Sequence, residues 1–290
     1  MAVAKGNVIT ISRGSTVARI NPENGQLFSL VRAGTEVMWK GGAPEGERPA
    51  SGWQNSEFVM FPIVGSALRG VHIRGATFPV AKHGIARDLP WSMESTPDTV
   101  IAVQAYTGGR EVQRGKGETS VFPCSYRLTK LYHVAEELRA WGRLIFSVEI
   151  RNTSDAVLPY AVGWHPAFAA QNPKESAIEV LDGPLYAPIY SSRLGAVRRA
   201  EGNVVIVENS ARVTYDTLNF SVMLKHNFGN TQIWHTGEGL VALEPMTAAS
   251  LSRRGREGPV DILSCPGFRK LAPGMSETFT AEVAVQACRA

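Results

Sequence analysis

The chain has 290 residues, of which 44% are hydrophobic and 19% are charged, and its formal net charge is +4 at neutral pH. This is an ordinary globular composition, with enough apolar residues for one large β domain or two average domains. No apolar run reaches the length of a membrane span, and so mild a positive charge does not require a nucleic-acid partner.

The sequence begins with MAVAKGNVITI, which lacks the charged start, the long apolar stretch and the cleavage site of a secretory signal peptide. Its three cysteines, Cys124, Cys265 and Cys288, lie far apart and are odd in number, which favours reduced thiols over a disulfide framework. We therefore expect a cytoplasmic protein that binds neither a membrane nor nucleic acid.

Turn and loop signals come first along the chain. Asn24-Gly25 predicts a turn, and GGAPEGERPAS from Gly41 to Ser51 is the best candidate for a long loop. Gly108-Gly109 marks another turn. The stretch from Val134 to Trp141 fits either a short helix or a hairpin between two strands.

Period-two alternation of apolar and polar residues dominates the rest of the pattern. Between Leu144 and Arg151 every second residue is apolar, and the same alternation recurs from Phe279 to Val285. Turn signals at 152–155 and at Pro273-Gly274 separate such stretches. Because no long amphipathic helix competes with them, these short strands predict an all-β protein. We expect one large antiparallel β-sandwich domain over residues 1–290.

Several motifs that would indicate a bound phosphate, metal or nucleophile fail on inspection. The segment GREVQRGKG (109–117) has five residues between its glycines, where a phosphate loop has four, and it lacks the Ser or Thr that binds Mg²⁺. We interpret it as a solvated loop, and the basic clusters at 193–199 and 253–256 as solvated surface. The sequence has no C-x-x-C pair, no G-x-G-x-x-G after a strand and no G-x-S-x-G elbow to mark a nucleophile. We therefore expect neither a metal nor a cofactor.

Three well-separated segments combine a hydrogen-bonding side chain with turn-forming neighbours. They place His83 in KHGIAR (82–87), His165 in GWHPAF (163–168) and Glu244 in VALEPM (241–246). Singly, each is typical of a loop histidine or of a charge at the edge of a sheet. Together they provide an acid and a base near neutral pH, held at strand ends, which can act on two oxygens of one small substrate. Trp91 and Trp164 offer flat apolar faces of the kind on which sugars stack.

At this point the sequence resembles the aldose 1-epimerase (galactose mutarotase) family over nearly its whole length. The resemblance rests on Trp39, FPIVG (61–65), HGIAR (83–87) with Asp88 and Trp91, LPYAVGWHPAF (158–168) and LEP (243–245). The HG-x-AR-D form is similar to the branch associated with lactose-utilisation operons, which lies near the hexose-6-phosphate epimerases.

This resemblance implies a β-supersandwich with an open cleft, a small-molecule sugar as substrate and no cofactor. It implies that Glu244 removes the proton of the anomeric hydroxyl while His165 protonates the ring oxygen. His83 would hydrogen-bond the ring oxygen or a neighbouring hydroxyl, and Arg87 and Trp164 would line the cleft.

Two positions depart from the family pattern. Ser66 stands where the galactose enzymes carry an Arg, and Arg69 is the candidate to take over that contact. The sugar-binding Asp of the family has no secure counterpart. Asp216 is the nearest candidate by order along the chain, and it fits an exposed strand residue equally well.

Three functions stay open on the sequence. The leading one is mutarotation of a free aldose. The second is epimerisation of a hexose 6-phosphate whose phosphate is bound by Arg69, Arg74 or Arg87, since arginine suits bidentate contacts with phosphate. The third is a non-catalytic sugar-binding or sensing domain, against which the pairing of His165 with Glu244 argues. A glycosidase normally needs two carboxylates, and the sequence offers one well-placed candidate. The identity of the sugar and the oligomeric state are not determined by the sequence.

Overall fold

The computed structural model describes residues 8–39, 57–67, 69–114, 117–138, 140–169, 176–182, 187–193, 204–208, 210–235, 239–248, 251 and 258–288. Strands and turns make up nearly all of this part of the chain, as predicted. One turn of 3-10 helix, η2 (Ala86–Asp88), interrupts them. None of the helices in these ranges has the length and apolar character needed to cross a membrane.

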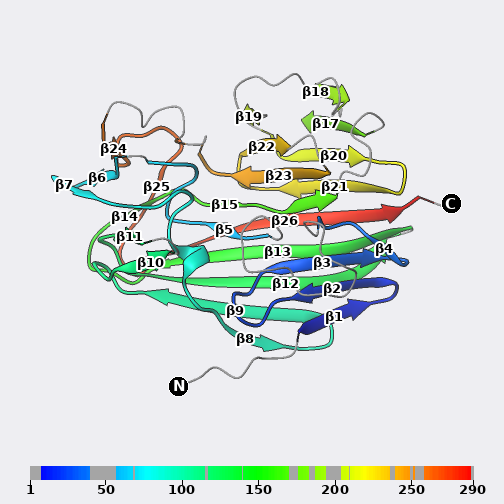
Figure 1. The fold of residues 1–290 in the computed structure, drawn as a ribbon, viewed down its shortest axis with the longest axis horizontal. Coiled ribbons are helices and arrows are strands. Elements are labelled where there is room, and N and C mark those ends of the chain that lie inside the picture. The colour runs from blue at the N-terminus through cyan, green and yellow to red at the C-terminus, as the bar shows by residue number, and fades with distance from the viewer. Residues whose placement is uncertain are drawn as a thin grey trace.

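The largest sheet has nine strands, and all its pairings are antiparallel. Their spatial order is β18 (Ala187–Arg193), β17 (Ala177–Asp182), β20 (Arg212–Asp216), β21 (Phe220–His226), β26 (Ser276–Ala287), β13 (Trp141–Asn152), β12 (Tyr126–Leu138), β9 (Thr99–Tyr106) and β8 (Ser92–Ser95). The long strands β12, β13 and β26 form its centre (Figure 1).

A second, six-stranded sheet positions the candidate site. It has the order β19 (Val204–Glu208), β22 (Asn230–His235), β23 (Leu240–Met246), β15 (Gly163–Trp164) and β5 (Val59–Met60), while β16 (Ala167–Ala169) pairs with β23. The N-terminal strands form a third sheet of β1 (Ile9–Arg13), β2 (Thr16–Ile20), β3 (Leu27–Arg32) and β4 (Thr35–Glu36).

Three small sheets complete the described structure. They are the hairpin β10 (Val112–Arg114) with β11 (Glu118–Ser120), the pair β14 (Leu158–Tyr160) with β25 (Arg269–Leu271), and a group of β24 (Val260–Asp261), β6 (Val71–Ile73) and β7 (Ala76–Phe78). The pairing of β24 with β6 is parallel.

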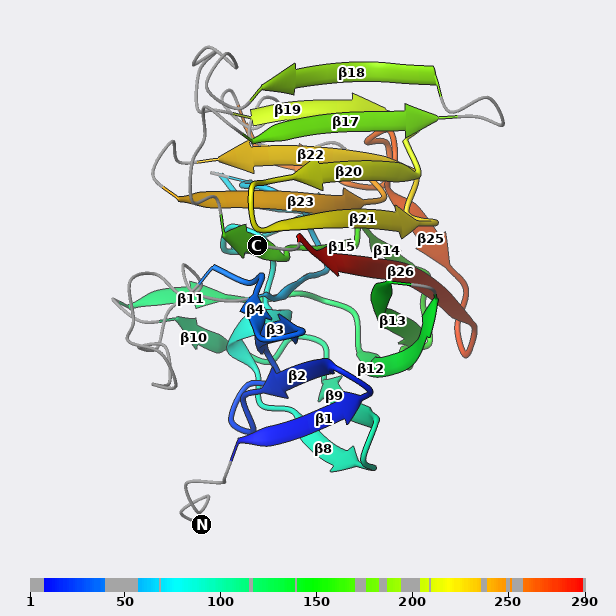
Figure 2. The same ribbon diagram turned by 90° about the vertical axis from the view of Figure 1, so that its right-hand side faces the viewer.

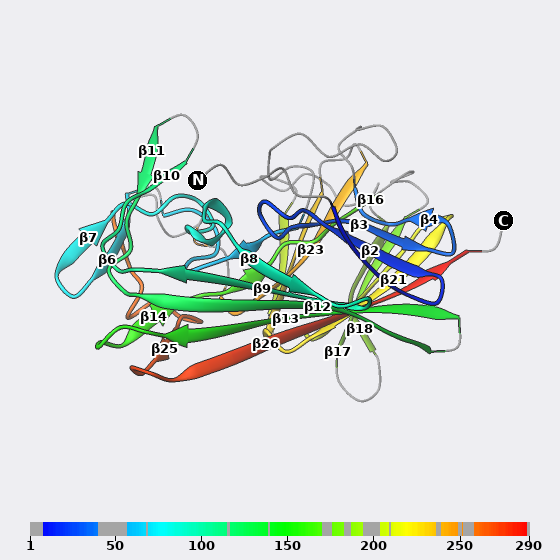
Figure 3. The same cartoon turned by 90° about the horizontal axis from the view of Figure 1, so that it is seen from below.

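The three largest sheets form two layers around a large hydrophobic cluster to which all three contribute. The six-stranded and N-terminal sheets lie over the same face of the nine-stranded sheet (Figures 2 and 3). On that face Phe146 of β13 stacks on Trp164 of β15, and β2 and β3 contact β13 and β26. The fold is therefore a β-sandwich, which confirms the predicted fold class.

Alternation of buried residues along the strands explains why these segments form a sandwich. In β13 the side chains of Leu144, Phe146, Val148 and Ile150 are buried, and the residues between them are partly exposed. The predicted alternation from Phe279 to Val285 falls in β26 and is buried in the same way. Such a pattern gives each strand one apolar face, which is satisfied only when a second layer covers it.

The structure also decides between alternatives that the sequence left open. The stretch from Val134 to Trp141 is the β12–β13 hairpin and not a helix. Asn24-Gly25, Gly108-Gly109 and Pro273-Gly274 lie in turns between strands, as predicted. The expected loop at 41–51 and the basic cluster at 253–256 lie outside the described residues, as does the cluster at 193–199 apart from the backbone of its first residue.

A buried ion pair joins the three large sheets. Lys130 of β12 and Glu57, two residues before β5, are at most 1% exposed, and their Nζ and Oε2 atoms are 3.8 Å apart. Lys130 donates a 2.5 Å hydrogen bond to the carbonyl of Gly25, next to β3. The Glu57 carboxylate accepts hydrogen bonds from the Tyr132 hydroxyl and from the Leu27 N–H. Burial lowers the pKa of Lys130, and the charge of Glu57 opposes this shift.

The same pair explains the position of Trp91. The Lys130 ammonium lies 4.6 Å from the centre of the Trp91 ring, and the ring is 7% exposed. A cation over an indole face is a favourable contact. Trp91 is thus a core residue, and the expectation that it offers its face to a sugar is wrong.

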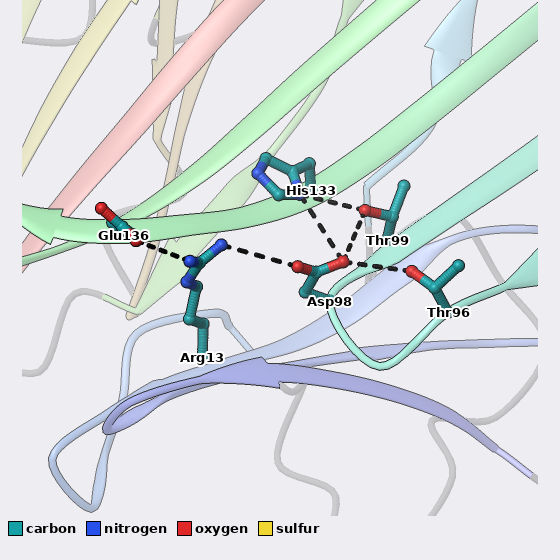
Figure 4. Close-up of polar contacts among 6 residues, drawn as sticks. All are labelled: Arg13, Thr96, Asp98, Thr99, His133 and Glu136. Atoms are coloured by element: carbon teal, nitrogen blue, oxygen red, sulfur yellow. Dashed lines mark hydrogen bonds and ion pairs between the residues drawn. The ribbon is translucent and has the colours of Figure 1, made fainter.

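A more exposed polar network fastens β1 to the nine-stranded sheet (Figure 4). Arg13 of β1 donates a 2.6 Å hydrogen bond to Glu136 and lies 3.6 Å from Asp98. Asp98 also accepts hydrogen bonds from the hydroxyls of Thr96 and Thr99. These hydrogen bonds hold the pKa of Asp98 below its usual value. Because this network is exposed to water, it stabilises the fold far less than a buried pair does.

We predict that Lys130→Met destabilises the protein strongly. Removal of the ammonium leaves the Glu57 carboxylate buried without its counter-charge, which typically costs about 3–5 kcal/mol. Urea unfolding of the variant measures this loss. The control is Arg13→Met, which breaks the exposed network and should change the unfolding free energy much less.

The double variant Glu57→Gln/Lys130→Met should be more stable than Lys130→Met, because no unpaired charge then stays buried. A Lys130→Met protein that is as stable as the Arg13→Met control would contradict this account of the ion pair.

Candidate acid–base site

The His83 loop is held by the backbone of a segment twenty residues earlier in the chain. The N–H of His83 donates to the carbonyl of Gly65 at 2.7 Å, and the N–H of Phe61 donates to the carbonyl of His83 at 3.2 Å. The N–H of Ile85 donates to the carbonyl of Phe61 at 2.8 Å. The FPIVG and KHGIAR motifs of the sequence therefore form one structural unit.

The His83 ring has a defined hydrogen-bonding state. Its Nδ1 accepts a 3.1 Å hydrogen bond from the N–H of Gly65, so the neutral ring carries its proton on Nε2. Burial lowers the pKa of His83 well below its usual value, and the nearby His165 lowers it further. His83 also has a positive φ of 65°, a left-handed conformation that is uncommon for residues other than glycine.

The next residue has to be glycine. Gly84 has a φ of +77°, and a Cβ atom at this position would lie 2.0 Å from the carbonyl oxygen of Phe61. No side chain fits so close to a backbone oxygen. The His-Gly pair of the sequence is therefore explained by the close approach of these two segments.

His165 and Glu244 meet on the outer side of the six-stranded sheet. His165 follows β15, Glu244 lies in β23, and the His165 Nε2 is 3.4 Å from the Glu244 Oε1. The other carboxylate oxygen, Oε2, accepts a 2.9 Å hydrogen bond from the amide of Gln232 on the neighbouring strand β22. This bond fixes the orientation of the carboxyl group.

Phe58 contacts three of the candidate side chains. Its ring stacks on the ring of His165 with centroids 4.6 Å apart, and it meets the ring of His83 edge-on at 5.7 Å. The guanidinium of Arg87 lies 5.1 Å from the centre of the same ring. The rings of His83 and His165 are 6.1 Å apart. Trp234 contacts His165 edge-on from β22.

Burial dominates the electrostatics of the pair. His83, His165 and Glu244 are at most 6% exposed. Burial lowers the pKa of His165 to about 3 and raises the pKa of Glu244 to about 8, because both charged forms lose hydration. The hydrogen bond from Gln232 works against the shift in the pKa of Glu244. Burial, with a contribution from Arg114, also lowers the pKa of Arg87 to about 10.

The structure thus brings together four of the seven residues expected from the sequence, namely His83, Arg87, His165 and Glu244. Trp164 does not join them. It is fully buried and stacks on Phe146 with centroids 4.4 Å apart, in the core between the two large sheets. The reason is the strand alternation, which directs neighbouring residues to opposite faces and so separates Trp164 from His165.

Asp216 does not join the site either. It is the exposed last residue of β20, and the residue before it, Tyr215, points into the core. The Asp216 side chain therefore faces solvent on the outer side of the nine-stranded sheet. Of its two interpretations, the exposed strand residue is the one that the structure supports.

Arg69 lies beside the site and not within the cluster around Phe58. With Ser66, Lys82 and Glu118 it lines a hollow of about 480 Å³ next to the His83 loop. Lys82 borders both places, because its charge lowers the pKa of His83, His165 and Glu244. The described residues contain no group of three or more His, Cys, Asp or Glu side chains arranged to hold a metal ion, and independence from metals stays a prediction.

Three residues that contact the candidate site were not predicted from the sequence. A fourth, Arg114, lies in the segment that we interpreted as a solvated loop. Gln232 orients Glu244, and Phe58 and Trp234 contact His165. The alternation of Gln232 and Trp234 along β22 was the one available signal, because residues two apart on a strand share a face. Nothing in the sequence around Phe58 distinguishes it from a core residue.

Comparisons with known proteins relate this geometry to a fold. No protein-family model matches the sequence, and no curated protein resembles it closely enough to count as a relative. A galactose mutarotase-like protein from Lactobacillus casei superposes with a TM-score of 0.73 over 97% of this chain and 100% of its own, at 20% identity. The fold is galactose mutarotase-like.

Further solved structures agree. An aldose epimerase homologue from C. elegans has a TM-score of 0.68 at 12% identity, over 98% of this chain and 99% of its own. A galactose 1-epimerase from Lactobacillus acidophilus has a TM-score of 0.65 at 12% identity, again over 98% and 99% of the two chains. At these identities the likeness concerns the fold, and the expected lactose-operon branch stays a prediction.

We predict that Gly84→Ala destabilises the protein by more than Gly274→Ala. The two glycines have almost equal φ angles, +77° and +76°, so both substitutions carry the same left-handed strain. Gly274 has open space around it, whereas a Cβ at Gly84 collides with the carbonyl of Phe61. Thermal melts of both variants isolate the cost of the collision. Equal melting temperatures would show that the His83 loop is not held against Phe61.

Proposed function

We propose that this protein is an aldose 1-epimerase that interconverts the α and β anomers of a free aldose by acid–base ring opening. The observation that carries the proposal is the buried pair of His165 and Glu244, whose Nε2 and Oε1 atoms are 3.4 Å apart. The anomeric oxygen O1 and the ring oxygen O5 are bonded to the same carbon, C1, so adjacent acid and base atoms suit them. The fold shared with a galactose 1-epimerase supports the same class of reaction.

The reaction needs one proton removed and one proton supplied. The Glu244 carboxylate takes the proton of the O1 hydroxyl while the His165 imidazolium gives a proton to O5. The C1–O5 bond breaks, and C1 and O1 form the free aldehyde. After rotation about the C1–C2 bond, the Glu244 carboxyl returns a proton to O1 and the neutral His165 takes the proton of the O5 hydroxyl. The pair ends as it began, and the sugar closes as the other anomer.

Burial strengthens both groups for this exchange. A carboxylate whose pKa is raised to about 8 is a stronger base than an exposed one, and an imidazolium whose pKa is lowered to about 3 is a stronger acid. The ionised pair and the neutral pair hold the same number of protons. They are therefore the two states between which ring opening and ring closure move the site.

His83 and Arg87 are proposed to bind the sugar. Because the Nδ1 of His83 is occupied by the N–H of Gly65, its Nε2–H is the atom that donates to the ring oxygen or to a neighbouring hydroxyl. The Arg87 guanidinium stays ionised at neutral pH, since its pKa is about 10, and it has several donors for hydroxyl groups.

Epimerisation of a hexose 6-phosphate is the second candidate. It is favoured by the hollow next to His83, where Arg69 and Lys82 place two positive charges. Arg74, which the sequence also offered as a phosphate ligand, donates instead to the carbonyl of Val157 at 2.6 Å. The carboxylate of Glu118 lines the same hollow and repels an anion, which makes a free aldose the better candidate.

We also propose that the reaction takes place in the cytoplasm. Cys124, Cys265 and Cys288 are all free thiols in the structure, which suits a reducing compartment. A purely sugar-binding role does not account for the side-by-side burial of His165 and Glu244, because binding alone needs no acid next to a base.

We predict that wild-type protein accelerates anomer exchange of at least one free aldose, and that His165→Gln and Glu244→Gln each lower kcat by about 10²–10⁴-fold. Both changes preserve shape but remove a proton-transfer group, so melting temperatures should be little changed. NMR saturation transfer across free aldoses and hexose 6-phosphates measures the rates. Glu282→Gln, on β26 in an ion pair with Arg143, is the matched control and should keep wild-type activity.

The double variant should lose little more than either single variant, because removal of one partner already prevents the coupled proton transfers. Exchange of hexose 6-phosphates alone would replace the first candidate with the second. Single variants that keep more than about a third of wild-type kcat would disprove the proposed roles, since a catalytic acid or base contributes far more than that.

We predict a broad, level pH profile of kcat/KM. Between the pKa of His165, about 3, and the pKa of Glu244, about 8, the pair holds one proton and can react. Above the higher value the pair loses this proton and O5 has no donor. Below the lower value a second proton blocks the base, so kcat/KM falls on both sides.

Measurements of kcat/KM across this pH range, corrected for uncatalysed anomer exchange in the same buffer, check this profile. A limb with its midpoint near 4.5 or 6.5, the ordinary values of the two groups, would show that burial does not govern their ionisation during catalysis.

A further inference from the structure

Arg114 contacts the His83 loop at backbone carbonyls other than the one that Phe61 contacts. It lies at the end of β10, and its guanidinium donates to the carbonyls of Lys82 at 3.1 Å and Gly84 at 2.9 Å. Its Nε donates to a carboxylate oxygen of Asp88 at 2.9 Å, and its Nη2 lies 2.5 Å from the same atom. All three acceptors belong to the segment 82–88, which carries both His83 and Arg87.

The segment needs contacts beyond those with Phe61 and Gly65. His83 adopts a left-handed backbone conformation, and strain of this kind persists only where surrounding contacts fix it. The backbone of Phe61 and Gly65 provides some of these contacts. Arg114 provides further contacts, at the carbonyls of the two residues that flank His83.

The position of Arg114 in the fold separates this task from general stability. The β10–β11 hairpin is a two-stranded sheet that pairs with no strand of the other described sheets. Within the described residues, every hydrogen bond of the Arg114 side chain ends in the segment 82–88. The side chains of Arg114 and Asp88 are 15% and 17% exposed, so water competes only weakly with these bonds.

We propose that Arg114 is a positioning residue, which sets His83 and Arg87 for the sugar without contacting the sugar itself. This inference rests on the proposed mutarotase function. It makes the β10–β11 hairpin part of the catalytic apparatus, although the hairpin carries none of the proton-transfer groups.

Arginine is needed here because of its shape. A guanidinium has five N–H donors in a rigid plane and reaches two carbonyls and a carboxylate at once, whereas a lysine ammonium is a single point on a flexible stem. Arg114→Lys therefore keeps the charge and loses the geometry. Asp88→Asn is the milder variant, because it keeps the bonds to Lys82 and Gly84 and weakens only the ionic contact.

The first test is kinetic. Arg114→Lys should lower kcat/KM by roughly ten- to hundredfold, as expected when groups that bind and orient the substrate are displaced by about 1 Å. Asp88→Asn should cause a smaller loss of the same kind. The matched control is Arg143→Lys, which alters a comparable ion pair with Glu282 on the nine-stranded sheet and should leave kcat/KM unchanged.

A double-mutant cycle with His83→Gln measures whether the two residues are coupled. A residue that only stabilises the fold would show no such coupling. If Arg114 acts through this segment, Arg114→Lys should cost much less in the His83→Gln background than in the wild type. Full additivity of the two losses would overturn the proposal. An unchanged kcat/KM in Arg114→Lys would also overturn it.

The second test does not depend on activity. Amide hydrogen exchange of Gly84 and Ile85, whose N–H groups donate to Ala81 and Phe61, should speed up by at least about tenfold in Arg114→Lys and stay at the wild-type rate in Arg143→Lys. Wild-type protein that exchanges no anomers would defeat the proposed function, and this measurement would still decide the role of Arg114. Unchanged exchange at both amides would overturn that role.

Discussion

The buried ion pair of Lys130 and Glu57 is the interaction on which the arrangement of the sheets depends. Each charge is shielded from water and is tolerated only because the other is present, so the pair forms only when all three large sheets are in place. Glu57 directly precedes Phe58, the ring that contacts His83, His165 and Arg87. The pair therefore links correct assembly of the sandwich to correct assembly of the site.

Burial of charged groups has opposite consequences at this pair and at the pair of His165 and Glu244. At Lys130 and Glu57 the charges are matched by each other and by hydrogen bonds, and both groups serve the structure. At His165 and Glu244 burial opposes both charged forms, because neither group has a counter-charge and hydrogen bonds strong enough to offset the loss of hydration. Desolvation thus accompanies rigidity at the first pair, and under the proposed function it tunes an acid and a base at the second.

Much of this could be predicted from local patterns in the sequence. Period-two alternation gave the all-β sandwich, and the His-Gly, Trp-His-Pro and Glu-Pro motifs gave the residues that meet, because turn chemistry and strand ends leave local signatures. Trp164 was misplaced although alternation next to His165 separates the two side chains. Arg114 could not be found, since its contacts join residues far apart in the chain and its own segment has no periodicity.

The way in which Arg114 binds its segment has a consequence for divergence among related chains. Its guanidinium donates hydrogen bonds to two backbone carbonyls, which every residue type provides, and to only one side chain, that of Asp88. Substitution at Lys82 or Arg87 leaves these contacts intact, whereas Gly84 is fixed by its contact with Phe61. Evolution can therefore vary the side chains at positions 82 and 87 while the histidine between them keeps its place. If the protein is the aldose 1-epimerase proposed above, its preference for one sugar over another changes by single substitutions without loss of the reaction.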